Sequence, residues 1–209
     1  MEKIEKRIYV FAGPNGSGKS TVVKLFMDEG VCPQYYICPD QLVPPDKKSD
    51  VVEYLKAMEA AERLRLDAIS NGLSFSFETV LSTQGKLDFI KFAQSEGYFV
   101  TVIYIMTSNP KINLERIKAR VKHGGHDVPH EKVIARYEKC LTLMFDVIMA
   151  SNLAIVYDNS ADSPTVVLDK SEYGCFAYFG EGQQHDEWFN KYLLPKAIAS
   201  GINIKPDAF

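Results

Sequence analysis

Residues 8–20 read IYVFAGPNGSGKS, and this stretch decides the fold. Residues 8–12 are apolar and rich in β-formers, and glycine and proline follow at once. The rest matches the pattern G-x-x-x-x-G-K-[ST], in which backbone N–H groups curl around phosphate oxygens. A helix-like segment, residues 19–29, comes directly after it. Because this phosphate-binding loop requires a strand before it and a helix after it, the sequence predicts a nucleotide-binding protein.

The residues of the loop divide the work of binding a triphosphate. Glycines allow positive φ angles and let the backbone approach the phosphates closely. Lys19 brings a full charge to the outer phosphates, and the hydroxyl of Ser20 is a ligand for Mg²⁺, so we expect ATP and Mg²⁺ as cofactors. The expected nucleotide contacts are Gly13, Asn15, Gly16, Ser17, Gly18, Lys19, Ser20 and Thr21.

Strand-like and helix-like segments alternate along the chain, which indicates an α/β fold with a mainly parallel sheet. Further strands are expected at residues 35–38, 73–80, 98–106 and 153–157. Helices are expected at residues 84–96, 110–121 and 129–150, and from a cap at Ser49 or Asp50 to about residue 70. The run YFVTVIYIM at 98–106 suits a central strand covered on both faces. Residues 161–209 should add a hairpin at 165–179 and a helix at 186–200, packed on the same domain as the core at 1–160.

The composition is that of a soluble globular protein and excludes several other classes. The 209 residues are 46% hydrophobic and 24% charged, which argues against disorder, collagen and coiled coils. The 24 basic and 27 acidic residues give a net charge of −3, so the surface has no general attraction for nucleic acid or acidic lipid. The four cysteines form no C-x-x-C pair, and no apolar run has membrane-spanning length. We therefore expect a reduced, cytoplasmic protein with no nucleic-acid or membrane partner.

Two carboxylates are candidates for the chemistry. Asp40 follows the second strand, at the sheet edge where open α/β sheets bind ligands, and it could take a proton from a substrate hydroxyl. Glu78 lies near the end of the third strand among apolar neighbours, where a carboxylate needs a metal, a substrate or an arginine beside it. A loop Asp in an Asx-turn and a structural ion pair are the alternative explanations.

Three arginines suggest a lid at about residues 116–136. Arg116 and Arg120 lie four residues apart on one helix, and Arg136 lies on the next helix, across the loop KHGGHDVP. Closure of such a lid would bring guanidinium groups to the transferring phosphoryl and exclude water. Taken alone, this pattern is more often a solvated basic helix face.

Two further clusters remain open from the sequence. His123, His126 and His130 are close together, but a mobile loop whose histidines make hydrogen bonds explains them better than a metal site. Residues 158–160, Asp-Asn-Ser, follow the fifth strand, where either a nucleoside contact or an ordinary turn fits.

These residues, taken together, resemble the zeta toxin family, and most closely its short stand-alone members. The motifs occur in the family's order between residues 8 and 160: AGPNGSGKS (12–20), PD (39–40), FETVLS (77–82), RVKHGGHDVP (120–129), IARY (134–137) and YDNS (157–160). The resemblance implies a nucleoside-kinase-like P-loop NTPase fold, a three-layer sandwich with a mainly parallel five-stranded sheet and a helical lid. It also implies that ATP phosphorylates a hydroxyl group, and in the toxins proper this hydroxyl belongs to UDP-N-acetylglucosamine. The resemblance further admits an antitoxin as a protein partner.

The resemblance also implies roles for matching residues. Lys19 and Ser20 would hold phosphates and Mg²⁺, Asp40 would be the general base, and Glu78 would bind substrate or order the site. Arg120 and Arg136 would neutralise charge on the transferring phosphoryl, with Arg116 a further candidate. The chain is shorter than the toxins proper, so kinase chemistry carries over better than the acceptor. An ATPase switch that binds a protein partner is the alternative function, and a kinase acting on nucleic-acid ends fits the net charge less well.

Overall fold

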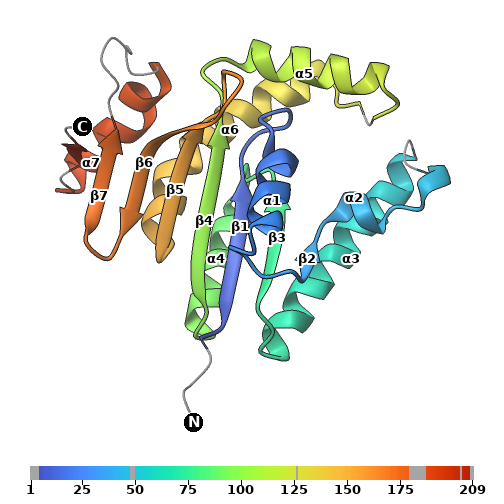
Figure 1. Cartoon of the computed structure of the whole chain (residues 1–209), viewed down its shortest axis with the longest axis horizontal. Coiled ribbons are helices and arrows are strands. Elements are labelled where there is room, and N and C mark those ends of the chain that lie inside the picture. Colours follow the sequence, from blue (N-terminus) through green and yellow to red (C-terminus); the bar gives the residue numbers. More distant parts are fainter. Residues whose placement is uncertain (1–4, 48–49, 126, 179–186, 203, 208–209) are drawn as a thin grey trace.

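The computed structural model describes residues 5–47, 50–125, 127–178, 187–202 and 204–207. These residues form one eight-stranded sheet in the order β2-β3-β1-β4-β5-β6-β7-β8 (Figure 1). The strands are β1 Arg7–Ala12, β2 Tyr36–Ile37, β3 Phe75–Thr79, β4 Phe99–Met106, β5 Leu153–Asp158, β6 Thr165–Ser171, β7 Gly174–Tyr178 and β8 Ile204–Asp207. The predicted α/β class with a mainly parallel sheet is confirmed.

The five strands expected from the sequence, β1 to β5, all pair in parallel with one another. β1 pairs with β3 and β4, and β2 and β5 extend the sheet on either side. β2 and β3 lie on one side of β1, and β4 and β5 lie on the other. The carboxyl end of β1 is therefore the switch point where such sheets bind ligands. The phosphate-binding loop follows this end directly.

The sheet is longer than the five strands predicted. β6 is antiparallel to β5, β7 is antiparallel to β6, and β8 pairs with β7 in parallel. The predicted hairpin is therefore present and continues the main sheet. Its position has a physical reason, because the free edge of β5 would otherwise leave a row of backbone donors and acceptors unpaired.

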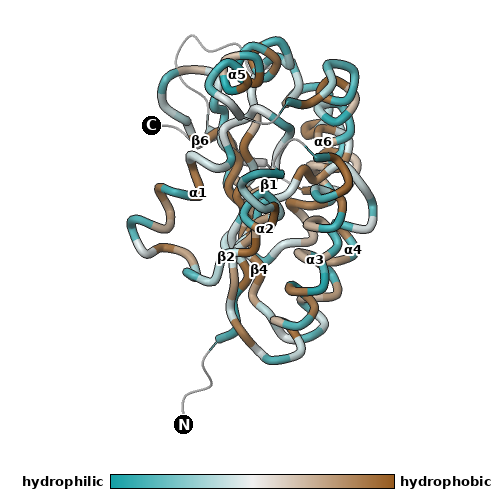
Figure 2. The backbone as a smooth tube through the Cα atoms, turned by 90° about the vertical axis from the view of Figure 1, so that its right-hand side faces the viewer, coloured by the Kyte–Doolittle hydropathy of each residue, from teal (hydrophilic) through white to brown (hydrophobic). Residues whose placement is uncertain are grey.

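Helices cover both faces of the sheet and make three layers, as expected. Figure 2 shows the sheet edge-on, with α1 on one side and α3, α4 and α6 on the other. The helices are α1 Lys19–Asp28, α2 Pro39–Leu42, α3 Val51–Ser70, α4 Gln84–Ser95, α5 Pro110–Lys122, α6 His130–Ala150 and α7 Leu194–Ala199, with short turns at Pro45–Lys47 and Phe189–Leu193. β4 lies in the middle of the sheet, and its residues from Val100 to Met106 are all buried, as its apolar sequence predicts.

Local sequence signals explain where α3 begins. The side chain of Asp50 accepts hydrogen bonds from the backbone N–H groups of Val52 and Glu53, so Asp50 is the N-cap of α3. Before it, the segment between β2 and α3 contains the short helix α2, with Pro39 in its first turn. Asp40 therefore lies on a helical turn three residues after β2, and the strand is shorter than predicted.

The tail departs furthest from the expectation. The predicted helix at 186–200 starts at a residue outside the described part, and Glu187 is its first described residue. Its middle is a π-helical turn, Phe189–Leu193, ahead of Pro195, which has no backbone N–H to continue an α-helical ladder. β8 had no signal in the sequence. No helix among the described residues is long and apolar enough to cross a membrane.

Candidate functional site: a phosphate-binding loop beside a carboxylate cluster

The loop between β1 and α1 is held in place by segments from the other half of the chain. Gly16 has φ 76°, and a β-carbon there would lie 2.5 Å from the backbone oxygen of Asn113 on α5. Gly18 has φ 94°, and its β-carbon would lie 2.2 Å from the side-chain nitrogen of Asn159, after β5. The left-handed backbone and this close packing both require glycine, so the motif's glycines have a tertiary reason as well as a local one.

Three side chains fasten the loop through hydrogen bonds. Asn113 Nδ2 donates to the backbone oxygen of Asn15 at 2.8 Å, and Asn159 Nδ2 donates to that of Ser17 at 2.8 Å. Arg136 Nη1, on α6, donates to Asn15 Oδ1 at 3.0 Å. α5, α6 and the turn after β5 thus fix the loop's shape, which is the preorganisation that phosphate binding needs.

Lys19 is a buried cation at the base of the loop. Its Nζ donates to the backbone oxygens of Gly13 at 3.0 Å and Pro14 at 2.9 Å. Burial lowers the pKa of this lysine, and the negative charge of Glu78 opposes that change. No carboxylate forms an ion pair with Lys19 in the described part of the chain.

The hydroxyl of Ser17 lies in the same loop and is also buried. Ser17 Oγ has no hydrogen-bond partner among the described residues. A buried hydroxyl without a partner is costly, and a phosphate oxygen at the loop would satisfy it. The buried ammonium, the orphaned hydroxyl and the backbone curl all fit a bound phosphate chain.

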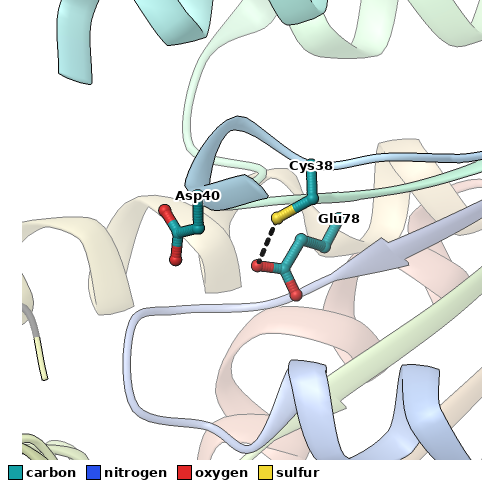
Figure 3. A group of neighbouring side chains, drawn as sticks. All are labelled: Cys38, Asp40 and Glu78. Carbon is teal, nitrogen blue, oxygen red and sulfur yellow. Dashed lines mark hydrogen bonds between the residues drawn. The ribbon is translucent and has the colours of Figure 1, made fainter. Parts of the chain in front are cut away.

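A carboxylate cluster lies beside the loop (Figure 3). Glu78 on β3 accepts a 3.0 Å hydrogen bond from Ser20 Oγ at Oε2 and a 3.7 Å contact from Cys38 Sγ at Oε1. One ligand atom each from Cys38, Asp40 and Glu78 lie within 4.8 Å of one another. The hydroxyl and carboxylate oxygens suit a hard cation such as Mg²⁺, whereas a thiol does not.

Two residues at this cluster, Cys38 within it and Tyr54 beside it, had no signal in the sequence. Burial and the charge of Glu78 raise the pKa of the Cys38 thiol to about 12, so Cys38 stays neutral at physiological pH. Burial, the negative charge of Asp40 and a hydrogen bond with that carboxylate raise the pKa of Tyr54, on α3, to about 12. Tyr54 therefore lies against the Asp40 carboxylate. Neither residue belongs to a recognisable motif, and only the fold places them beside the acids.

The structure treats the three predicted arginines differently. Arg136 is half-buried and reaches the loop through Asn15. Arg120 is exposed in the last turn of α5, and its charge contributes to lowering the pKa of Lys19. Arg116 lies one turn earlier on α5, and its buried Nη1 has no hydrogen-bond partner among the described residues.

The remaining sequence candidates lie at the border of the site. Ser160 Oγ accepts a 2.7 Å hydrogen bond from the backbone of Ser108, and the backbone of Ser160 donates to Asp158 at 2.8 Å. These bonds tie the turns after β4 and β5 together and explain how Asn159 is presented to the loop. His123 contacts the backbone oxygen of Ala119 at 2.8 Å, and His126 lies outside the described residues. No histidine belongs to a three-ligand group in the described ranges.

The comparisons with known proteins agree with this architecture. The family model described as "Zeta toxin" matches residues 1–162. An uncharacterized protein of Haemophilus influenzae is 33% identical over 135 residues, which are 64% of this chain and 94% of that protein.

Two solved structures are similar in fold. A chain from the PezAT chromosomal toxin–antitoxin system of Streptococcus pneumoniae has a TM-score of 0.59 at 15% identity, covering 90% of this chain and 77% of that one. A chain of the AvrRxo1-ORF1:AvrRxo1-ORF2 complex, determined with ATP, has a TM-score of 0.70 at 15% identity, covering 92% of this chain and 64% of that one.

Proposed function

Because the chain belongs to the zeta toxin family, we propose that it is an ATP-dependent kinase that phosphorylates a hydroxyl of a small molecule. A sugar nucleotide such as UDP-N-acetylglucosamine is the first acceptor to test. One observation carries the proposal: the phosphate-binding loop, with its buried Lys19 and orphaned Ser17 hydroxyl, lies directly beside the cluster of Ser20, Glu78 and Asp40. The similarity to a complex determined with ATP supports the choice of nucleotide.

The residues of the chain divide the reaction between them. Mg·ATP supplies the phosphoryl group and neutralises part of its charge, and Ser20, oriented by Glu78, would hold the metal. Lys19 binds the outer phosphate oxygens. Asp40, held by Tyr54, takes the proton from the acceptor hydroxyl as that oxygen attacks.

The arginines neutralise the charge that spreads over the transferring phosphoryl group. Arg136 already lies at the phosphate-binding loop, because its guanidinium hydrogen-bonds Asn15 there. Arg120 approaches from the end of α5, on the solvent side, and Arg116 lies one turn behind it. α5, α6 and the loop between them are thus proposed as the lid that excludes water from the reacting groups.

The test is an acceptor screen with labelled ATP. Wild-type protein and Asp40→Asn are each incubated with Mg·ATP and sugar nucleotides, sugars or nucleosides, and labelled small-molecule product is measured. We expect an acceptor-dependent product from the wild type and a rate lower by roughly 10²–10⁴-fold for Asp40→Asn, with nucleotide binding retained. Equal rates for the two proteins would show that Asp40 is not the base. Hydrolysis of ATP that never depends on an acceptor would favour the switch function.

We further propose an antitoxin as protein partner, since a similar chain comes from a toxin–antitoxin system. Expression of the wild type in a bacterial host is then expected to arrest growth, whereas expression of Asp40→Asn to the same level is not. Normal growth with active wild-type enzyme would contradict a toxic role and leave the kinase assignment intact.

A further inference from the structure

Lys86, in the first turn of α4, is a half-buried lysine that the proposed reaction does not use. Its Nζ donates a 2.7 Å hydrogen bond to the backbone oxygen of Val80, immediately after β3. Lys19 makes the same kind of contact with Gly13, immediately after β1. Both ammonium groups thus lie against carbonyls at the carboxyl edge of the sheet.

The strand register places these two contacts at the same height. Ala12 on β1 is paired with Thr79 on β3, so Gly13 and Val80 leave neighbouring parallel strands at one level. Neighbouring strands lie about 4.8 Å apart, so the Gly13 and Val80 carbonyls that accept from the two lysines are on adjacent strands. The carbonyl that Lys86 contacts follows β3, which lies between β1 and β2 in the sheet, whereas the Asn113 and Asn159 contacts come from α5 and from the turn after β5.

Arg65, on α3, adds a second cation beside Lys86. Its guanidinium carbon lies 5.0 Å from the ring centre of Phe77 and 5.6 Å from that of Phe89. Phe89 is three residues after Lys86 on the same face of α4, so the aromatic pair brings the two cations together.

Neither Lys86 nor Arg65 forms a direct ion pair in the described part of the chain. The one carboxylate that acts on Arg65 is Glu62, on the same helix, and it opposes the lowering of the Arg65 pKa by burial. The groups that act on Lys86 are Arg65 from α3, Arg136 and Cys140 from α6, and Lys19 from α1. Burial, together with repulsion from the three cations, lowers the pKa of Lys86 to about 8, and the Cys140 interaction opposes this change. Cys140 has its pKa raised to about 11, mainly by burial, so at neutral pH it offers no negative charge in return.

A group of partly buried cations without direct ion pairs is costly and is relieved by an anion. Lys19 and Arg136 are assigned to the nucleotide, which leaves Lys86 and Arg65 on the acceptor side. We propose that Lys86, with Arg65, binds a dianionic group of the acceptor, such as a phosphate ester, and so selects acidic acceptors over neutral ones. This inference rests on the proposed kinase function.

The test uses inorganic pyrophosphate as the anionic probe. Protein saturated with magnesium and a non-hydrolysable ATP analogue is titrated with pyrophosphate by calorimetry at pH 7. We expect the wild type to bind pyrophosphate, Lys86→Met to bind it at least tenfold more weakly, and Lys86→Arg to stay within about threefold of the wild type. Lys91→Met, which removes an exposed lysine from the same helix, is the matched control and should bind as the wild type does.

The outcomes separate the two proposals. The subsite alone would be overturned if the wild type bound the ATP analogue normally but took up no pyrophosphate, or if wild type and Lys86→Met took up pyrophosphate equally. Lys86 would then have only a structural role, as the donor to the Val80 carbonyl. Failure of the wild type to bind the ATP analogue would refute the kinase function, and the subsite with it. Loss of uptake in both Lys86→Met and Lys86→Arg would also overturn the subsite, because a charge-based contact should survive the arginine.

Discussion

The backbone of Gly18 shows how much of the site depends on single residues. Its φ angle is 94°, and Asn159 Nδ2 would lie 2.2 Å from an added β-carbon. Asn159 uses the same nitrogen to donate to the Ser17 carbonyl. An added methyl group would therefore both strain the backbone and push away the side chain that holds the loop.

We predict that Gly18→Ala weakens Mg·ATP binding by at least tenfold, measured by calorimetry. Gly30→Ala is the matched control, since Gly30 also has a positive φ of 66° but nothing lies within 4 Å of the added β-carbon. That control should lose about 1 kcal/mol of stability through backbone strain and bind the nucleotide normally. Wild-type affinity in Gly18→Ala would show that the Asn159 contact does not shape the loop.

Lys86 should also leave a signature in the pH dependence of stability. Its pKa is lowered to about 8 in the folded protein, against an ordinary value of 10.5 for an exposed lysine. Between pH 8 and pH 10.5 the unfolded chain binds more protons than the folded protein, so the free energy of unfolding rises with pH. The destabilisation caused by the buried charge of Lys86 is therefore complete below pH 8 and absent above pH 10.5.

The free energy of unfolding of the wild type should therefore rise relative to that of Lys86→Met between pH 8 and 10.5, by at most about 3 kcal/mol. Chemical denaturation at pH 7, 8, 9 and 10 measures it. Lys91→Met should follow the wild type throughout, and a difference that does not change with pH would contradict the lowered pKa.

Among the elements, α5 connects most of the site through one buried side chain. Asn113 donates to the Asn15 backbone oxygen at 2.8 Å and accepts a hydrogen bond from the hydroxyl of Thr107, just after β4. Tyr137 on α6 donates to the Thr107 backbone oxygen at 2.5 Å. The loop, β4, α5 and α6 thus share one polar network, and the position of the proposed lid depends on it.

We predict that Asn113→Ala lowers the free energy of unfolding by about 1–3 kcal/mol, because it leaves buried polar partners unsatisfied. Nucleotide affinity should fall too, since the Asn15 segment loses its tether. Lys111→Ala, at an exposed position of the same helix, should change stability by less than about 0.5 kcal/mol. If both variants behaved alike, the network would not hold the loop.

At the scale of the whole molecule, the tail and the nucleotide-binding part share one core. Leu168 on β6 and Ala177 on β7 are buried in the same apolar cluster as Tyr104 and Val156. Trp188, the chain's single tryptophan, is buried in that cluster as well. We propose on this basis that residues 161–209 fold together with residues 1–160 as one domain.

A denaturant titration tests this arrangement. Trp188 fluorescence reports on the tail and far-UV circular dichroism on the whole chain, and the two transitions should coincide. Leu168→Ala should destabilise the protein by about 2–5 kcal/mol and shift both transitions together. A Trp188 transition at lower denaturant than the other would show that the tail unfolds separately.

Much of this architecture is encoded in local patterns. The apolar runs at β1, β4 and β5, the cap at Asp50 and the glycine-rich loop each act over a few residues, so they could be recognised one at a time. The helical turn at Asp40 could not, because Pro39 also fits a loop and nothing else in that polar stretch is periodic. β8 had no pattern because its place depends on pairing with β7.

The sequence alone determined the family, the α/β class and the phosphate-binding loop, since each rests on residue types at fixed short spacings. Only the tertiary structure decided which side chains meet at that loop. Cys38, Tyr54 and Lys86 carry no motif, and they join Asp40, Glu78 and Lys19 because parallel strands bring distant segments to one edge of the sheet. Burial there sets their charges, and burial is a property of the packed molecule that no short stretch of sequence contains.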